Sequence, residues 1–232
     1  MKKSIWIPGM SLSCALAGVA ALLLRWRLLS TGVDDKGLLT AGQPLAIISW
    51  ILTGCMVLLT VAAVWKHRNE KIAVHGSPVA TVARILAMAA AAVLFRDGTL
   101  LGSATSLAAA ATGIVSFLEL YQSKKRLPPA VVGIPTVLFF MLCLLSCYRI
   151  WSAEPEIQRY CYRLLALVCL MMAAYQSSAV SLGMGKGNIF LGAGFLSVYF
   201  AFAAGADPGF TVLFLALGVW MLAQLGAVAE EE

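Results

Sequence analysis

Eight long apolar stretches, separated by short polar joints, fill almost the whole of this 232-residue chain. Hydrophobic residues make up 61% of it and charged residues 12%, whereas soluble domains carry roughly 45–50% apolar and about 25% charged residues. A soluble chain of this length could not bury so much apolar surface. A bilayer accepts it, because a helix of about 20 apolar residues crosses a hydrocarbon core about 30 Å thick. The sequence therefore predicts an integral membrane protein whose outer surface contacts membrane lipid.

Each apolar stretch is expected to be a helix, because backbone polar groups in lipid must be satisfied within the segment. Strands of a membrane barrel would alternate apolar and polar residues, and runs such as 107–111 do not. We predict an all-α membrane protein in which residues 1–232 form a single transmembrane domain, one bundle of eight transmembrane helices. The expected spans are 5–29, 44–65, 78–95, 99–121, 130–150, 160–182, 188–204 and 209–229.

Boundary residues support several of these spans. The first stretch ends at Arg25-Trp26-Arg27 without a small-residue cleavage site, so we expect a retained helix and not a cleaved signal peptide. Ser77-Pro78 has the chemistry of a helix start. Asn188 is expected to cap the seventh span, and Asp207-Pro208-Gly209 predicts a tight turn before the eighth.

Lysine and arginine in the loops predict the orientation. The basic loops around 66–71 and 124–126 favour the cytoplasmic side, which puts both termini in the cytoplasm and the protein, multi-pass, in a bacterial cytoplasmic membrane. Arginines at the opposite ends are expected to snorkel and pair with loop acids, although they could instead grip an anionic ligand or lipid headgroup. These outer charges are Arg25, Arg27, Asp34, Asp35, Arg96, Asp97, Arg149, Glu154, Glu156, Arg159, Arg163 and Asp207.

The two halves share a short pattern that indicates a duplication. Residues 26–30 read Trp-Arg-Leu-Leu-Ser and precede Asp34-Asp35, while residues 148–152 read Tyr-Arg-Ile-Trp-Ser and precede Glu154. Four spans per half is an even number, so the halves would be two parallel four-helix repeats, at 5–121 and 130–229. Parallel repeats occur in some transporters, but simple gene duplication also produces them.

Three short motifs carry a resemblance to a known family. They are Arg25-Trp26-Arg27, the loop 34–38 that leads to Pro44, and the segment from Arg149 through Glu154 to Arg159-Tyr160. On these residues the chain resembles a family of eight-span integral membrane proteins of unknown function from Clostridia-type bacteria. The resemblance implies the eight-span topology and the bacterial inner membrane. It implies no activity, ligand or catalytic residue.

Polar residues within the third and fourth spans form the first candidate site. Thr112, Ser116 and Glu119 fall on one helical face. They could line a cavity in which Glu119 is a cation or proton site, or they could simply pack helices, with hydroxyls bonded to their own backbone. Arg84 is predicted at a similar depth on the preceding antiparallel span. A charge inside a membrane is usually paired, so we expect an Arg84–Glu119 ion pair.

The sixth span carries the second candidate site, a polar patch that includes Tyr175, Gln176, Ser177 and Ser178. It could bind a small polar solute or bond neighbouring helices. The residues predicted to bind a ligand are Thr112, Ser116, Glu119, Arg84, Tyr175, Gln176 and Ser178.

Catalytic, cofactor and metal-binding motifs are missing from the sequence, so we predict a protein that is not an enzyme and needs no cofactor. Its low charge and its lack of a soluble domain argue against nucleic-acid binding. The leading hypothesis is binding or translocation of a small solute or lipid. The alternative is a non-catalytic accessory or structural subunit of a membrane complex, with an intramembrane enzyme as a distant third.

Overall fold

The computed structural model describes residues 6–32, 43–68, 72–74, 77–96, 98–121, 129–151 and 157–230. Within these ranges the chain forms eight helices and two short strands. The helices are α1 (Trp6–Thr31), α2 (Pro44–Lys66), α3 (Pro78–Leu94), α4 (Leu100–Tyr121), α5 (Pro129–Trp151), α6 (Ile157–Ser181), α7 (Gly187–Ala204) and α8 (Thr211–Leu225). The strands are β1 (Ile72–Val74) and β2 (Val228–Glu230).

The prediction of a helical membrane protein is confirmed. Six of the described helices are long and apolar enough to cross a membrane, namely α1, α2, α4, α5, α6 and α7. The other two, α3 and α8, have 17 and 15 residues. At 1.5 Å per residue these two reach only about 22–26 Å, which is less than the thickness of a typical hydrocarbon core. The count of eight complete spans stays a prediction.

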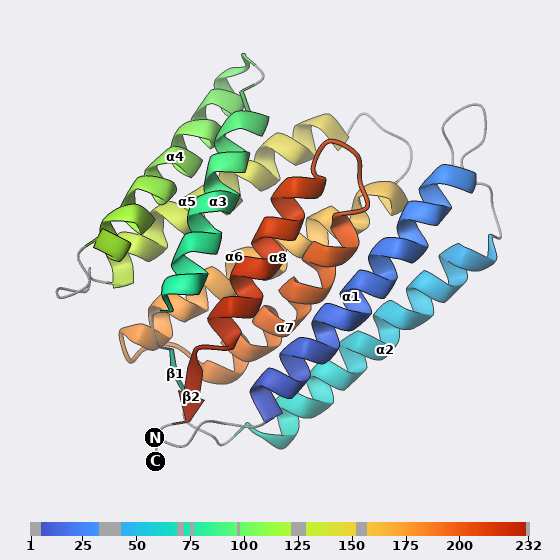
Figure 1. Cartoon of the computed structure of the whole chain (residues 1–232), viewed down its shortest axis with the longest axis horizontal. Coiled ribbons are helices and arrows are strands. Elements are labelled where there is room, and N and C mark those ends of the chain that lie inside the picture. Colours follow the sequence, from blue (N-terminus) through green and yellow to red (C-terminus); the bar gives the residue numbers. More distant parts are fainter. Residues whose placement is uncertain are drawn as a thin grey trace.

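Six helices close into a ring. Each helix from α3 to α8 packs on the next along the chain, and α8 returns to pack on α3. Helix α1 lies on the outside of this ring against α7, and α2 packs on α1 and α7 (Figure 1). Because α7 contacts α1, α2, α6 and α8, it is the most buried of the six long helices.

Close helix contact in this fold depends on small residues. At Gly18 of α1, an added Cβ would lie 2.9 Å from the Cβ of Phe202 and 3.1 Å from the backbone oxygen of Tyr199, both in α7. At Gly133 of α5, the same atom would collide with the Ser178 side chain of α6. These glycines let the helix backbones approach, as is usual in membrane bundles.

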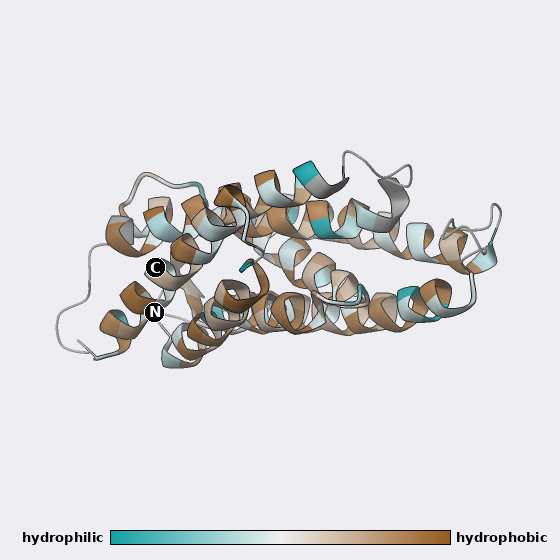
Figure 2. Cartoon of the chain, turned by 90° about the horizontal axis from the view of Figure 1, so that it is seen from above, coloured by the Kyte–Doolittle hydropathy of each residue, from teal (hydrophilic) through white to brown (hydrophobic). Residues whose placement is uncertain are grey.

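Large apolar side chains cover the outside of the bundle. Leu58, Val93, Leu100 and Leu107 each expose 70% or more of their surface. Figure 2 shows that hydrophobic residues predominate along the helices on both sides of the molecule. Such continuous apolar surface marks a membrane-embedded protein, because soluble monomers rarely expose large apolar patches.

The two strands lie beside each other at one end of the bundle, which we call the strand end. Strand β1 follows α2 and pairs antiparallel with β2, so that Ala73 faces Ala229. At the same end Trp6, the first residue of α1, stacks on His67 at the end of α2, with ring centroids 4.2 Å apart. The first helix therefore starts, and the last one ends, at the same end of the bundle (Figure 1).

The structure differs from the sequence-based prediction at the end of α8 and at Asn188, and agrees with it at the turn before α8. The eighth span was predicted to run to residue 229, but α8 ends at Leu225 because Gly226 caps it and residues 228–230 pair with β1. Asn188 does not cap α7, since Lys186 holds that position. Its amide instead donates a hydrogen bond to the Arg68 carbonyl, 2.6 Å away. The predicted turn at Asp207-Pro208-Gly209 is confirmed, and Gly209 has a positive φ of 88°.

The two predicted repeats do not pack alike in the described residues. Helix α6 packs extensively on α7, whereas α2 and α3, the corresponding pair in the first half, share no comparable contact. The shared pairs α1–α2 with α5–α6 and α3–α4 with α7–α8 are compatible with a duplication. A superposable four-helix repeat stays a prediction.

Candidate functional site

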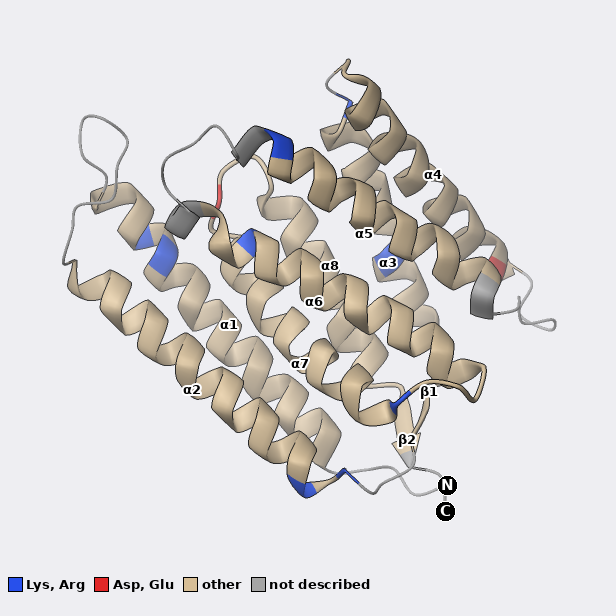
Figure 3. Ribbon diagram, turned by 180° about the vertical axis from the view of Figure 1, so that it is seen from behind, with Lys and Arg blue, Asp and Glu red and all other residues tan. Residues whose placement is uncertain are grey.

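The predicted ion pair between Arg84 and Glu119 is confirmed. The Arg84 guanidinium donates from Nη2 to Glu119 Oε2, joining α3 to α4. Arg84 lies two turns into α3 from its start and is buried, while the Glu119 side chain keeps 28% of its surface exposed. Figure 3 shows the basic position within α3 and the acidic position near the end of α4. The pairing follows from depth, because Arg84 and Glu119 are both near the strand-end termini of antiparallel neighbours.

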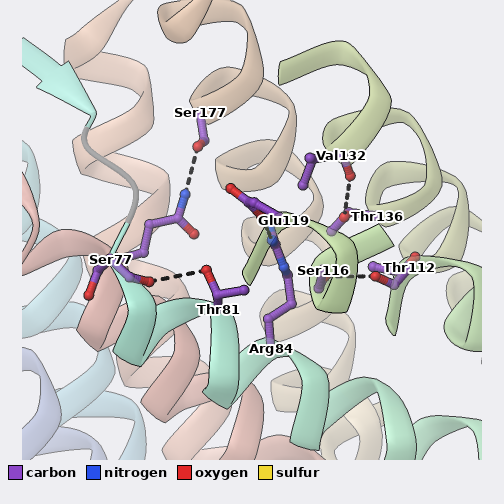
Figure 4. A network of polar contacts seen from close by, with 10 residues as sticks. Ser77, Thr81, Arg84, Thr112, Ser116, Glu119, Val132, Thr136 and Ser177 are labelled. Atoms are coloured by element: carbon purple, nitrogen blue, oxygen red, sulfur yellow. Dashed lines mark hydrogen bonds and ion pairs between the residues drawn. The ribbon is translucent and has the colours of Figure 1, made fainter. Parts of the chain in front are cut away.

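A second polar contact crosses the ring beside this pair. Gln224, in the last turn of α8, donates from Nε2 to the Oγ atom of Ser177 in α6, 2.6 Å away. Figure 4 shows Ser177 and the Arg84–Glu119 pair facing the same space between the helices. We call Arg84, Glu119, Ser177 and Gln224 the Arg84 cluster. It brings together residues from four helices of the ring.

Two buried polar atoms of the Arg84 cluster have no hydrogen-bond partner among the described residues. They are the Nε atom of Arg84, which is a donor, and the Oε1 atom of Gln224, which is an acceptor. Buried polar groups are normally satisfied, and an unmade hydrogen bond of this kind costs about 1–3 kcal/mol. A donor and an acceptor left over in the same cluster are what a small polar ligand would bind.

An aromatic layer closes the ring one helical turn away from the Arg84 cluster. Trp220 of α8, four residues before Gln224, stacks on Phe140 of α5 with ring centroids 6.1 Å apart. Both side chains are almost completely buried, and Phe139 packs beside Phe140. The polar cluster therefore lies between the strand end and an apolar barrier.

The hydroxyl groups of Thr112 and Ser116, two candidates of the fourth span, bond to their own helix. Thr112 donates to the Ala108 carbonyl and Ser116 to the Thr112 carbonyl, at 2.8 and 2.7 Å. Both side chains are buried near the Arg84 cluster (Figure 4). Their hydrogen bonds are those predicted for residues that pack helices together. Whether they also touch a ligand stays a prediction.

The side chains of the three sixth-span candidates point to different surroundings. Tyr175 is 56% exposed on the outside of the bundle. The Gln176 side chain accepts a hydrogen bond from the backbone N–H of Lys186 and so holds the turn before α7. Ser178 donates to the Ala174 carbonyl and packs on Gly133. Their neighbour Ser177 is the residue of this patch that reaches the Arg84 cluster.

A second charged cluster lies at the opposite end of the bundle. Asp207, in the turn between α7 and α8, has no exposed surface. Its Oδ1 accepts from Arg25 Nη2 at 3.0 Å and its Oδ2 from Arg163 Nε at 2.6 Å. We call these three residues the Asp207 cluster, and it ties the turn to α1 and α6. Pairing of outer arginines with Asp207 is thus confirmed, but the pair is buried and not on the surface.

Aromatic rings surround the Asp207 cluster and continue it into the bundle. The Arg25 guanidinium lies 4.2 Å from the ring centroid of Tyr162. Thr53 Oγ1 lies 2.8 Å from the Tyr162 hydroxyl and 2.9 Å from the Tyr199 hydroxyl. This chain joins α6, α2 and α7 through buried hydroxyl groups.

Other predicted features fall outside the described residues or find no support there. The loop acids Asp34, Asp35, Asp97, Glu154 and Glu156 and the basic loop 124–126 lie outside them, as does the side chain of Arg159. Within the described part of the chain, no group of three histidine, cysteine, aspartate or glutamate residues could hold a metal ion.

Four residues of these hydrogen-bond networks are not among the residues predicted from the sequence, namely Gln224, Thr53, Tyr162 and Tyr199. Gln224 carries a sequence signal, since an amide in a Leu-rich apolar segment needs a partner.

Comparisons of the chain with family models, with curated proteins and with solved structures found no match. The resemblance to an eight-span family of Clostridia-type bacteria therefore stays a prediction.

Proposed function

We propose that this protein binds a small polar solute at the Arg84 cluster and moves it across the membrane. One observation carries the proposal: a buried guanidinium N–H and a buried amide oxygen, from different helices, are both left without a partner in the described part of the chain. Charged and polar groups in a membrane span are expensive, and they commonly mark a substrate or ion pathway. We propose no enzymatic step, because no catalytic residues converge at the cluster.

The location of the cluster fits such a role. It lies near the strand end, and the Glu119 side chain is partly exposed. The charges of the loops favour placing this end of the bundle in the cytoplasm. All eight helices would enter a bacterial cytoplasmic membrane. A solute could reach Arg84 from that side, and the stacked pair Trp220 and Phe140 would have to separate for it to pass further.

A second function, a non-catalytic accessory or structural subunit, has its own support. The hydroxyl groups of Thr112, Ser116 and Ser178 all donate hydrogen bonds to backbone carbonyls of their own helix. Aromatic side chains fill the middle of the ring. A bundle built only to pack would have these features, but it would not require a buried Arg84 whose Nε atom has no partner among the described residues.

Solute flux into proteoliposomes tests the proposal. Vesicles holding the purified protein would be mixed with glycerol, urea, glycine, sodium acetate or methylammonium chloride, and their volume recovery followed by stopped-flow light scattering. We expect at least one solute to enter faster than it enters protein-free vesicles. The Arg84→Met variant should lose this flux, while Thr60→Val should retain it, because Thr60 lies on α2 outside the ring and bonds its own helix. If no solute enters faster, the subunit function is favoured and transport is contradicted.

A further inference from the structure

We infer that the Arg84 cluster takes a small solute that is net neutral and carries both a hydrogen-bond acceptor and a hydrogen-bond donor. Zwitterions and uncharged amides belong to this class, whereas free anions and free cations do not. The inference rests on the proposed function, and it names the class of solute for the same site.

Charge balance is the first argument. Arg84 and Glu119 form an ion pair, so the cluster has no net charge, and Arg84 is buried. A net-neutral solute keeps that balance. An anion or a cation would leave one charge uncompensated in a medium where desolvation of an ion costs several kcal/mol. A buried neutral pair therefore selects against ions of either sign.

Hydrogen-bond chemistry is the second argument. The Arg84 Nε atom can only donate, and the Gln224 Oε1 atom can only accept. Neither has a partner among residues described by the structure. A solute that satisfies both must itself offer an acceptor to Arg84 and a donor to Gln224. In the structure the Gln224 Nε2 atom donates to Ser177 Oγ, which leaves Oε1 as the free atom of the amide.

The surroundings limit the solute to a small one. The cluster is bordered by the buried pair Trp220 and Phe140 within one turn of Gln224. Thr112 and Ser116, further along α4, already donate to their own backbone (Figure 4). The groups that remain to recognise a ligand are the guanidinium, the carboxylate and one amide. This set matches the two ends of a compact solute.

Thermal unfolding of the full-length protein in nanodiscs tests the solute class. Glycine is the zwitterionic probe, urea the uncharged amide, sodium acetate the anion and methylammonium chloride the cation, with sodium chloride matching ionic strength. We expect glycine or urea to raise the Tm saturably, since a ligand of the folded state stabilises it. Acetate and methylammonium should bind at least roughly tenfold more weakly, because each adds an unpaired charge.

A charge variant makes the test specific to the site. In Glu119→Gln the Arg84 charge has no carboxylate partner, so the variant should gain a saturable Tm increase with acetate and lose its preference for glycine or urea. Thr60→Val should behave as the unchanged protein. If acetate or methylammonium stabilises the unchanged protein most, and Arg84→Met abolishes the effect, the solute class is wrong while the site stands. If the Arg84-dependent flux is carried by acetate or methylammonium and not by glycine or urea, the class is likewise wrong. If neither binding nor flux is found, the proposed function fails as well.

Discussion

Replacing Asp207 by asparagine removes one negative charge from the Asp207 cluster while keeping the shape of the side chain. The carboxylate has no exposed surface and accepts hydrogen bonds from Arg25 and Arg163, at 3.0 and 2.6 Å. An asparagine can accept through its single oxygen only. Its NH₂ group would face one of the two guanidinium groups, and two donors cannot bond to each other.

The expected loss of stability follows from this geometry. Hydrogen bonds to charged groups contribute about 1.5–3 kcal/mol each, and removing one partner of a buried ion pair costs about 3–5 kcal/mol. Asparagine retains one acceptor, so we expect Asp207→Asn to lower the free energy of unfolding by about 3 kcal/mol. The turn between α7 and α8 should also detach from α1 and α6, because the cluster joins them.

Reversible unfolding in mixed micelles, titrated with a denaturing detergent, measures this loss. Thr211→Val is the matched control. Thr211 donates 3.1 Å to the backbone oxygen of Asp207 and so belongs to the same turn without carrying charge. The Thr211→Val substitution should lower the free energy of unfolding by about 1 kcal/mol. If Asp207→Asn costs no more than Thr211→Val, the Asp207 cluster contributes no net electrostatic stability and the reasoning is refuted.

Three further substitutions test other contacts. Arg84→Met and Glu119→Gln, combined in a double-mutant cycle, should show a coupling energy of about 1–3 kcal/mol in unfolding titrations, and zero coupling would show that the pair adds nothing. Gly18→Val should lower the free energy of unfolding by about 1–3 kcal/mol, because its Cβ would lie 3.1 Å from the Tyr199 carbonyl oxygen; unchanged stability would mean that α1 shifts freely. Tyr199→Phe removes a hydroxyl that is bonded to Thr53 and should cost about 1 kcal/mol in the same titration, whereas a gain in stability would contradict a satisfied hydroxyl network.

The contact between Arg84 and Glu119 is predictable from the sequence because it depends only on local quantities. The helix rise fixes how deep each residue lies, and α3 and α4 are consecutive antiparallel helices. The contact between Ser177 and Gln224 depends instead on how α6 and α8 are placed around the ring. Apolar periodicity does not encode the order of non-consecutive helices, so this contact could not be predicted.

The opposite end of the bundle shows a similar limit. The charges of Arg25, Arg163 and Asp207 were expected at helix ends and expected to pair, as observed. Their burial was not expected, because it arises when the α7–α8 turn folds in against α1 and α6. The end of α8 could not be predicted either, since residues 226–230 are mostly small or apolar, yet residues 228–230 pair with β1 instead of continuing the helix.

Accessibility of Ser177 to a small aqueous reagent tests the central claim, that the Arg84 cluster is a solute site open toward the strand end. Ser177→Cys would be placed in a variant with all six native cysteines replaced, and labelled with a small methanethiosulfonate reagent in intact cells and in inverted vesicles. Thr60→Cys is the control, because Thr60 is buried on α2, outside the ring. The account predicts labelling of Ser177→Cys in inverted vesicles and not in intact cells, and no labelling of Thr60→Cys from either side. A Ser177→Cys variant that is unlabelled from both sides would contradict it.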